Sequence, residues 1–318
     1  MTADSATAVR PLPVPPTAMQ AAVLEWYAEH GRALPFRRAR NAYEILVSEL
    51  MSHQTQAARA GEAWADFLVR FPSFEALAAA APAEVLRAWA GLGYDRRAIY
   101  LWRTATIVVA ELGGRLPDDP EELERLPGIG PYTARAVAAL AFGRPVGAVD
   151  TNVRRVLGRV AGGGSALSTR SIQELADELV PRGEAGTWTH ALMDIGARLC
   201  RPNRPDCPAC PLRSWCRFAG SAEPIPGRRA PRRDVQHPFP TTRRWLRGRI
   251  LARLRSAPDG TWVRLPVPIG QHDGEAIAVA LAAMARDGVV EVDVEGETEV
   301  AAGHGRASPP LARLPLVG

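Results

Sequence analysis

The most concentrated set of reactive side chains is a group of four cysteines. They are the only cysteines in 318 residues, they fall within 17 positions, and they follow the spacing C-x6-C-x2-C-x5-C: Cys200, Cys207, Cys210 and Cys216. Zinc sites usually use two close pairs, whereas only one C-x-x-C pair is present here. Four thiolates in one loop suit a [4Fe–4S] cluster, which takes one cysteine per iron. The spacing favours this cluster, with zinc or no metal as alternatives.

Two carboxylates are placed where they could act as an acid and as an anion. Glu49 follows the apolar residues Ile45 and Leu46 by four and three positions, so it lies at the edge of an apolar helix face. Partial burial there raises the pKa of a carboxyl and lets it serve as a general acid. Asp150 is placed to cap a helix over 151–160, whose positive end keeps a carboxylate ionised. An exposed helix glutamate and a purely structural cap are the ordinary alternatives.

A glycine-containing turn is the third candidate. Residues 126–134 (LPGIGPYTA) lie between a charged segment and an alanine-rich one, both expected to be helical. Gly128 and Gly130 allow a tight turn that exposes backbone amides, and Pro131 suits the first position of the next helix. Amides at a helix N-terminus bind phosphate without reading base sequence. Ordinary helical hairpins use the same turn, so its function is not decided by these residues alone.

The basic residues exclude one mechanism and indicate a class of partner. All 39 are arginine, so no side-chain amine is available to form a Schiff base, and only the α-amine of Met1 remains. Arginine exceeds the 34 acids, giving a net charge of +5, and residues 217–255 hold eleven arginines against two acids. Such a segment attracts polyanions, unless it is only a solvated linker in an arginine-rich composition.

The pattern along the chain predicts a helical core and a small second module. Residues 1–18 are expected to be a disordered tail, and 19–217 carry Ala/Leu/Val-rich segments separated by Gly and Pro, which predicts an all-α fold. No apolar run is long enough to span a membrane and no signal peptide is recognisable, so we expect a cytoplasmic protein.

A Pro/Arg linker over 218–242 is expected to precede the second module. The module, over 243–302, should contain helices over 245–255 and about 275–287 and a β-hairpin over 288–300 centred on Gly296. This order predicts a winged-helix-like α+β module, with a purely helical appendage as the alternative. Residues 303–318 are expected to be a tail.

Four motifs together resemble one family. The run 126–150 resembles the helix-hairpin-helix and Gly/Pro...Asp motif of the endonuclease III superfamily of DNA glycosylases, and the cysteine spacing matches that superfamily's iron–sulfur loop. Within it, residues 34–37 (LPFR), 43–56 (YEILVSELMSHQTQ) and 91–94 (GLGY) resemble the MutY family of A/G-specific adenine glycosylases. The resemblance covers about 20–217.

The resemblance implies a fold, a cofactor and a partner. The fold is a two-lobed helical glycosylase core, with a six-helix lobe over about 36–150 and an iron–sulfur lobe formed by the N-terminal helix and about 151–217. The cofactor is a [4Fe–4S] cluster on the four cysteines. The partner is double-stranded DNA containing a mispair or lesion, bound by a nucleoid-associated monomer. The sequence does not decide whether the protein also contacts a repair partner.

The resemblance also implies roles for individual residues. Glu49 protonates a purine nitrogen of an adenine flipped out of the duplex, and Asp150 stabilises the oxocarbenium-like sugar or bonds to it. The remaining residues expected to contact DNA or the substrate are Arg37, His53, Gln54, Thr55, Tyr94, Gly128, Gly130 and Asp194. Gln54, Thr55 and Tyr94 correspond to residues near the opposing 8-oxoguanine. For His53, the alternative is a histidine satisfied within an interface. For Asp194, the alternative is an ordinary acid on a helix surface.

Tyr132 stands where bifunctional endonuclease III enzymes carry the lysine that cleaves the strand. Tyrosine there, in a chain without lysine, predicts a monofunctional glycosylase that leaves an intact abasic site. Asn152, where those enzymes commonly have histidine, is expected to orient Tyr132 or a water molecule.

Several departures from the MutY pattern leave the opposing base open. Residues 52–54 read Ser-His-Gln instead of Leu-Gln-Gln, Phe36 replaces tryptophan, and Asp95 replaces a second tyrosine. The C-terminal Nudix-like domain that inspects 8-oxoguanine is not recognisable.

The leading hypothesis is excision of adenine opposite 8-oxoguanine or guanine. A thymine or uracil mismatch glycosylase is the first alternative, and a non-catalytic iron–sulfur DNA-binding protein is the second. Glu49 in its motif argues against the first. The presence of both Glu49 and Asp150 argues against the second.

Overall fold

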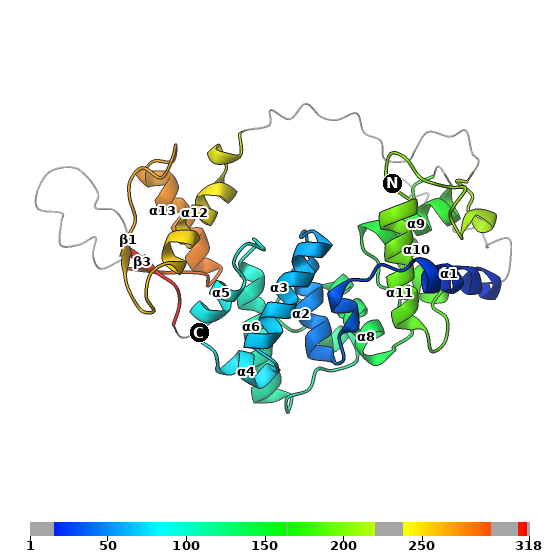
Figure 1. Cartoon of the computed structure of the whole chain (residues 1–318), viewed down its shortest axis with the longest axis horizontal. Helices are drawn as coiled ribbons and strands as arrows, with labels where there is room; N and C mark the ends of the chain where they lie inside the picture. The colour runs from blue at the N-terminus through cyan, green and yellow to red at the C-terminus, as the bar shows by residue number, and fades with distance from the viewer. Residues whose placement is uncertain (1–15, 164, 220–237, 294–310, 317–318) are drawn as a thin grey trace, which may run out of the picture. The chain divides into compact units, whose positions relative to one another are not determined.

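The computed structural model describes residues 16–163, 165–219, 238–293 and 311–316 (Figure 1). The first helix starts at Pro16, so the last three residues of the expected tail 1–18 are helical. Residues 1–15 lie outside the described part, as do 220–237 of the expected linker. The 3₁₀ turn η4 (Phe239–Thr241) falls within the rest of that linker.

Residues 16–219 form helices and turns. Their bounds are α1 (Pro16–His30), η1 (Pro35–Arg38), α2 (Ala42–Ser52), α3 (Ala57–Arg70), α4 (Phe74–Ala79), α5 (Pro82–Ala88), α6 (Arg96–Glu111), α7 (Pro120–Leu123), α8 (Pro131–Phe142), α9 (Thr151–Gly162), α10 (Thr169–Glu178), α11 (Ala185–Asp194), the π-helical turn η2 (Ile195–Leu199) and η3 (Arg213–Trp215). The described residues of this stretch contain no strand, which confirms the all-α prediction for the core.

Local chemistry explains where several of these helices begin. Asp119 accepts hydrogen bonds from the backbone of Glu121 and Glu122, and Pro120 follows at the first helical position of α7. Proline also occupies the first turn of α8, where its missing N–H costs nothing. The charged segment 121–125 was expected to be a longer helix, but α7 ends at Leu123 because the chain turns there toward the glycine-containing hairpin.

Contacts divide the chain into two units that differ from the expected lobes. The first unit combines residues 1–49 with 116–232, and the second combines 50–115 with 233–318. Within the expected six-helix lobe 36–150, residues 36–49 and 116–150 belong to the first unit, and residues 50–115 belong to the second unit with the C-terminal module.

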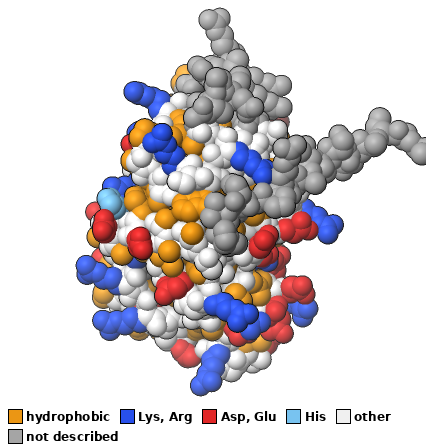
Figure 2. Space-filling model, turned by 90° about the vertical axis from the view of Figure 1, so that its right-hand side faces the viewer, with side chains coloured by type: hydrophobic (Ala, Val, Ile, Leu, Met, Phe, Trp, Pro, Cys, Tyr) orange, Lys and Arg blue, Asp and Glu red, His pale blue; other side chains and the backbone are white. Residues whose placement is uncertain are grey.

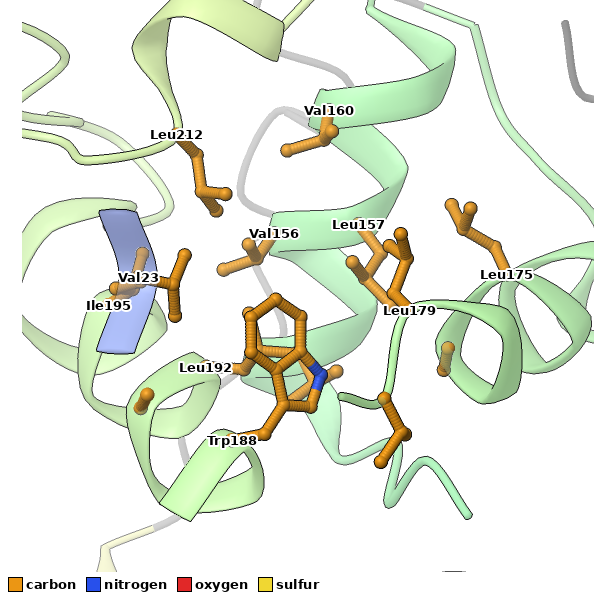
Figure 3. Packing of buried hydrophobic residues seen from close by; sticks show 14 of the residues in the cluster. Val23, Val156, Leu157, Val160, Leu175, Leu179, Trp188, Leu192, Ile195 and Leu212 are labelled. Atoms are coloured by element: carbon orange, nitrogen blue, oxygen red, sulfur yellow. The ribbon is translucent and has the colours of Figure 1, made fainter. Parts of the chain in front are cut away.

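A tryptophan-centred core holds the first unit together (Figure 3). Trp188 of α11 is 1% exposed, and its ring lies against Val156 of α9 and Leu192 of α11. Val23 of α1 and Leu212 of the cysteine loop belong to the same cluster. Burial of such side chains stabilises the packing by roughly 1.5 to 3 kcal/mol each, so α9 and the cysteine loop share one core.

The second unit combines helices α3 to α6 with the C-terminal module. Its core includes Phe67 and Trp89, whose rings meet edge to face at 6.0 Å. The module consists of α12 (Arg243–Arg255), β1 (Val263–Arg264), α13 (Gly274–Arg286), β2 (Glu291–Asp293) and β3 (Leu311–Arg313). Two packed helices and a small sheet agree with the predicted winged-helix-like α+β arrangement, seen beside α5 in Figure 1.

The sheet corrects the predicted C-terminal boundary. β3 lies between β1 and β2 and is antiparallel to both, with Ala312 opposite Val263 and Val292. Residues 311–313 are therefore a sheet strand, and the expected tail 303–318 is wrong at this point. The second half of the expected hairpin around Gly296 lies outside the described residues.

No described helix combines the length and apolar character needed to cross a membrane. On the face shown in Figure 2, arginine and acidic side chains are interspersed with apolar ones.

Candidate active site

Glu49 is a buried acid held by a tyrosine. It lies on α2, is 8% exposed, and its Oε2 accepts a hydrogen bond of 2.8 Å from the hydroxyl of Tyr132. Burial raises the pKa of Glu49 to about 7, the Tyr132 hydrogen bond opposes this, and the negative charge of Asp150 adds to it. A carboxyl with this pKa carries a proton near neutral pH, as a general acid must. The predicted burial of Glu49 is confirmed, and the pKa shift has the predicted direction.

Tyr132 donates a hydrogen bond to Glu49 and lies within the electrostatic influence of both carboxylates. It lies in the first turn of α8, and burial together with the charges of Glu49 and Asp150 raises its pKa well above 10. The phenol therefore stays protonated and donates to Glu49. The structure thus brings Glu49 of α2 together with Tyr132 and Asp150, which come from the consecutive helices α8 and α9.

The hairpin before Tyr132 shows two different uses of glycine. Gly128 has φ +76°, a left-handed conformation that favours glycine, and the turn is closed by the Ile129 amide donating to Leu126. Gly130 has φ −96°, and a Cβ there would meet no atom within 4 Å. The fold requires glycine at 128 but not at 130, so the small residue at 130 leaves open space beside the N-terminus of α8.

Asp150 is fixed through both carboxylate oxygens. One oxygen accepts from the backbone amide of Val153 at 2.7 Å, which confirms the predicted cap of α9. The other accepts from the side-chain amide of Asn152 at 2.9 Å. Asn152 was expected to orient Tyr132 or water, whereas in the structure its side-chain amide donates a hydrogen bond to Asp150. The orientation of the carboxylate is therefore set by α9 itself.

Sequence reasoning missed Arg155, which extends this arrangement to the cysteine loop. Its guanidinium donates to Asn152 Oδ1 at 2.8 Å, to the carbonyl of Gly196 at 2.7 Å and to the carbonyl of Cys200 at 2.6 Å. The spacing of Asn152 and Arg155 by three positions, which puts them on one side of α9, was the available signal. Hydrogen bonds therefore run from Asp150 to the first cysteine.

Gly196 makes the close approach of α9 and η2 feasible. A Cβ at this position would lie 2.6 Å from Asn152 Cβ, and real contacts are never that short. A larger residue would displace Asn152, and with it the support of Asp150. A π-helical turn such as η2 often occurs at functional sites.

The four cysteines are partly buried in one loop packed on the tryptophan-centred core. Cys200 Sγ accepts from Arg159 at 3.3 Å, and the 4%-exposed Arg159 also binds the carbonyls of Arg201 and Pro202. Backbone amides donate to the sulfurs of Cys210 and Cys216. In the part of the chain that the structure describes, no three Cys, His, Asp or Glu side chains converge to hold an ion as they stand.

Asp194 is a structural anchor and not a surface acid. It is fully buried, and both its oxygens accept from Arg37, at 2.6 and 2.7 Å, while Arg32 donates through its backbone and Nε. Burial raises the pKa of Asp194, but the hydrogen bonds and charges of Arg37 and Arg32 outweigh it and the net pKa is lowered. Arg37, expected among the DNA-contacting residues, is therefore engaged inside the protein.

The residues expected near the opposing base lie in the second unit. Gln54 and Tyr94 have φ +54° and +49°, left-handed conformations that cost a non-glycine residue about 1 to 3 kcal/mol each. Tyr94 is 47% exposed although it is large and apolar. Arg97 of α6 joins their two loops by donating to the carbonyls of His53 at 2.7 Å and Gly93 at 3.0 Å. The hydrogen bonds of Arg97 therefore stabilise the two loops that carry the strained backbone of Gln54 and Tyr94.

His53 and Thr55 belong to the same turn. Thr55 donates to the carbonyl of His53 at 3.3 Å. Burial, and then the charge of Arg97, lower the pKa of His53, so its ring is neutral near pH 7. A neutral imidazole offers one donor and one acceptor and is not a fixed cation.

Comparison with known proteins decides the family. Residues 47–182, which include Glu49, Tyr132 and Asp150, match the family of HhH-GPD superfamily base excision DNA repair proteins. The chain is 40% identical over 299 residues to the adenine DNA glycosylase of Mycolicibacterium smegmatis, an alignment that covers 91% of this chain and 97% of that relative. The chain belongs to the MutY family.

Solved structures share the fold of this MutY-family chain. A thermostable thymine-DNA glycosylase is 30% identical with a TM-score of 0.60, and the match covers 64% of this chain and 96% of the other. A non-covalent endonuclease III–DNA complex is 25% identical with a TM-score of 0.55, over 65% and 97% of the two chains. The predicted endonuclease III-like helical core is confirmed.

The raised pKa of Glu49 predicts a pH-dependent gain in stability for Glu49→Gln. The pKa is about 7 in the folded protein and about 4.5 in the unfolded chain, so the stability of the wild type falls as pH rises through this range. At about 1.4 kcal/mol per pKa unit, Glu49→Gln should be more stable by up to about 3 kcal/mol at pH ~8, with little difference at pH ~4. Chemical denaturation at both pH values measures this.

Glu62→Gln is the control for loss of one acidic charge, because Glu62 lies exposed on α3. Equal stability of wild type and Glu49→Gln at pH ~8 would show that the folded protein does not hold the proton on Glu49.

Proposed function

We propose that this MutY-family chain is a monofunctional DNA glycosylase that removes adenine paired with 8-oxoguanine or guanine during base excision repair. The observation that carries the proposal is the hydrogen bond from Tyr132 to a buried, proton-holding Glu49 beside Asp150. Hydrolysis of an N-glycosidic bond needs an acid for the leaving base and an anion for the cationic sugar. The relative in Mycolicibacterium smegmatis is named an adenine DNA glycosylase.

Each residue has a distinct part in the proposed reaction. Glu49 gives its proton to a ring nitrogen of the extruded adenine, so the base leaves as a neutral molecule. Asp150, oriented by Asn152 and the amide of Val153, remains negative and stabilises the oxocarbenium-like sugar. Tyr132 keeps the carboxyl of Glu49 in place. Water then completes the hydrolysis and leaves an abasic site.

The glycine-containing turn and the residues around Gln54 and Tyr94 are assigned to DNA binding in this proposal. The Gly128–Gly130 turn and the N-terminus of α8 hold a backbone phosphate, since open space lies beside Gly130. Gln54, Thr55 and Tyr94 contact the strand opposite the adenine, and His53 lies at the same turn. The protein acts as a monomer on double-stranded DNA.

The absence of lysine supports a reaction without strand cleavage. A lyase of the endonuclease III type requires a side-chain amine to form a Schiff base with the abasic sugar. The sequence contains no lysine. By the resemblance, Tyr132 stands at the position of the lysine in the bifunctional enzymes.

The four cysteines are proposed to hold a [4Fe–4S] cluster. Their donor set fits, because each cysteine supplies one thiolate and the sulfurs accept hydrogen bonds from Arg159 and from backbone amides. When bound, the cluster supplies four metal–thiolate bonds that cross-link the loop and a centre able to exchange one electron. Hydrogen bonds connect the cysteine loop to Asp150 through Arg155 and Asn152. Loss of the cysteine ligands should therefore disturb the orientation of the Asp150 carboxylate.

A thymine mismatch glycosylase is the second candidate, since one of the similar solved structures is a thymine-DNA glycosylase. Two features favour adenine: the adenine DNA glycosylase match extends over nearly the whole chain, and Glu49 is the protonated group that a purine leaving base requires.

The two candidates differ in a single-turnover substrate panel. Duplexes carrying A, T or U opposite G or 8-oxoguanine are incubated with the protein and analysed with and without alkali. We expect strand breaks at A, only after alkali, and a loss of about 10²- to 10⁴-fold in the rate for Glu49→Gln with binding retained. Breaks at T or U would support the second candidate. Breaks without alkali, trapped by borohydride on a side chain, would contradict a monofunctional enzyme.

The cluster is tested by metal analysis of the purified protein. We expect a brown protein with broad visible absorption and about four irons per chain. Cys207→Ser should lose colour and lower both stability and excision, whereas Ser214→Ala in the same loop should keep all three. A colourless protein with about one zinc per chain would contradict the cluster.

A further inference from the structure

The ring of Tyr94 is contacted by an arginine from the C-terminal module. The guanidinium carbon of Arg244, in the first turn of α12, lies 5.0 Å from the ring centroid. The guanidinium of Arg97 lies over the same ring at 5.6 Å. A cation within about 6 Å of an aromatic face is attracted by the ring's electrons. Two segments distant in the sequence therefore restrain the same exposed ring.

The two arginines differ in what else they hold. Arg97 donates to the carbonyls of His53 and Gly93 and also stacks on Trp89, so it is part of the fold. Arg244 is exposed, and within the described residues it makes no hydrogen bond or ion pair. Replacing Arg244 therefore removes its contact with Tyr94 without breaking the backbone network.

The helix that carries Arg244 is anchored next to Tyr94. At the other end of α12, Arg255 pairs with Asp95, the residue that follows Tyr94, and both side chains are 16% exposed. Arg255 Nε also donates to the carbonyl of Leu86 at 3.0 Å. A partly buried pair with further hydrogen bonds restricts movement more than an exposed pair does. The position of Arg244 over the ring is thus maintained by α12.

We propose that Arg244 is a positioning residue through which the C-terminal module orients Tyr94 at the base opposite the excised adenine. The inference rests on the proposed function, in which this loop contacts that strand. Tyr94 is a half-exposed aromatic residue on a left-handed backbone, and aromatic rings in such positions stack on bases or enter between them. A ring held in one direction discriminates between opposing bases better than a mobile one. The module thereby affects selectivity without a Nudix-like domain.

The test compares excision rates on two duplexes with the full-length, metal-loaded protein. Single-turnover rates are measured for adenine opposite 8-oxoguanine and opposite guanine, and their ratio reports selectivity. Arg244→Ala should lower the ratio about fivefold, in line with the strength of an exposed cation–π contact, and Arg244→Lys should restore part of it. Arg253→Ala is the matched control, because Arg253 is exposed on the same helix. It should leave the ratio unchanged.

A double-mutant cycle shows whether Arg244 affects selectivity through Tyr94. In a Tyr94→Leu background, Arg244→Ala should have no further effect on the ratio, because its partner is already gone. An undiminished effect in that background, or equal behaviour of Arg244→Ala and Arg253→Ala, would show direct phosphate binding and overturn the proposal. An unchanged ratio for Arg244→Ala would also overturn it. Absence of adenine excision by the wild type would instead refute the proposed function.

Discussion

The proposed active site depends on one buried carboxyl, that of Glu49, whose pKa is raised to about 7. Removal of Glu49 from water disfavours its charge, and the nearby negative charge of Asp150 disfavours it further. Tyr132 opposes this in part by donating to Glu49, and it stays protonated because the same carboxylates surround it. The two carboxyl groups of the proposed site are thus held differently: Glu49 is buried and accepts from Tyr132, whereas both oxygens of Asp150 accept from residues of α9.

The surrounding structure serves mainly to fix these groups. Asp150 is held at both oxygens, and its support continues through Asn152 and Arg155 to the carbonyl of Cys200. The tryptophan-centred core packs α9 and the cysteine loop together, so the loop and the helix that Asp150 caps are held by the same contacts. The second unit carries strained Gln54 and Tyr94 on loops tied by Arg97. The side chains whose orientation matters for the proposed reaction are thus the ones that the surrounding contacts restrain.

Local features of the site were predictable from the sequence, and long-range ones were not. The burial of Glu49 followed from apolar residues three and four positions before it, and the cap at Asp150 followed from residue type. The partners of Asp194 could not be found this way, because Arg32 and Arg37 are 162 and 157 positions distant. β3 was missed for the same reason, since it pairs across a long separation in the chain.

The pH dependence of excision tests the central claim most directly. Single-turnover rates of wild type on the adenine:8-oxoguanine duplex should fall about tenfold per pH unit above pH ~7, because Glu49 then loses its proton. Tyr132→Phe removes a hydrogen bond that lowers the pKa of Glu49, so the fall should move to higher pH. A fall centred near pH ~4.5, or a shift to lower pH in Tyr132→Phe, would contradict a buried acid restrained by Tyr132.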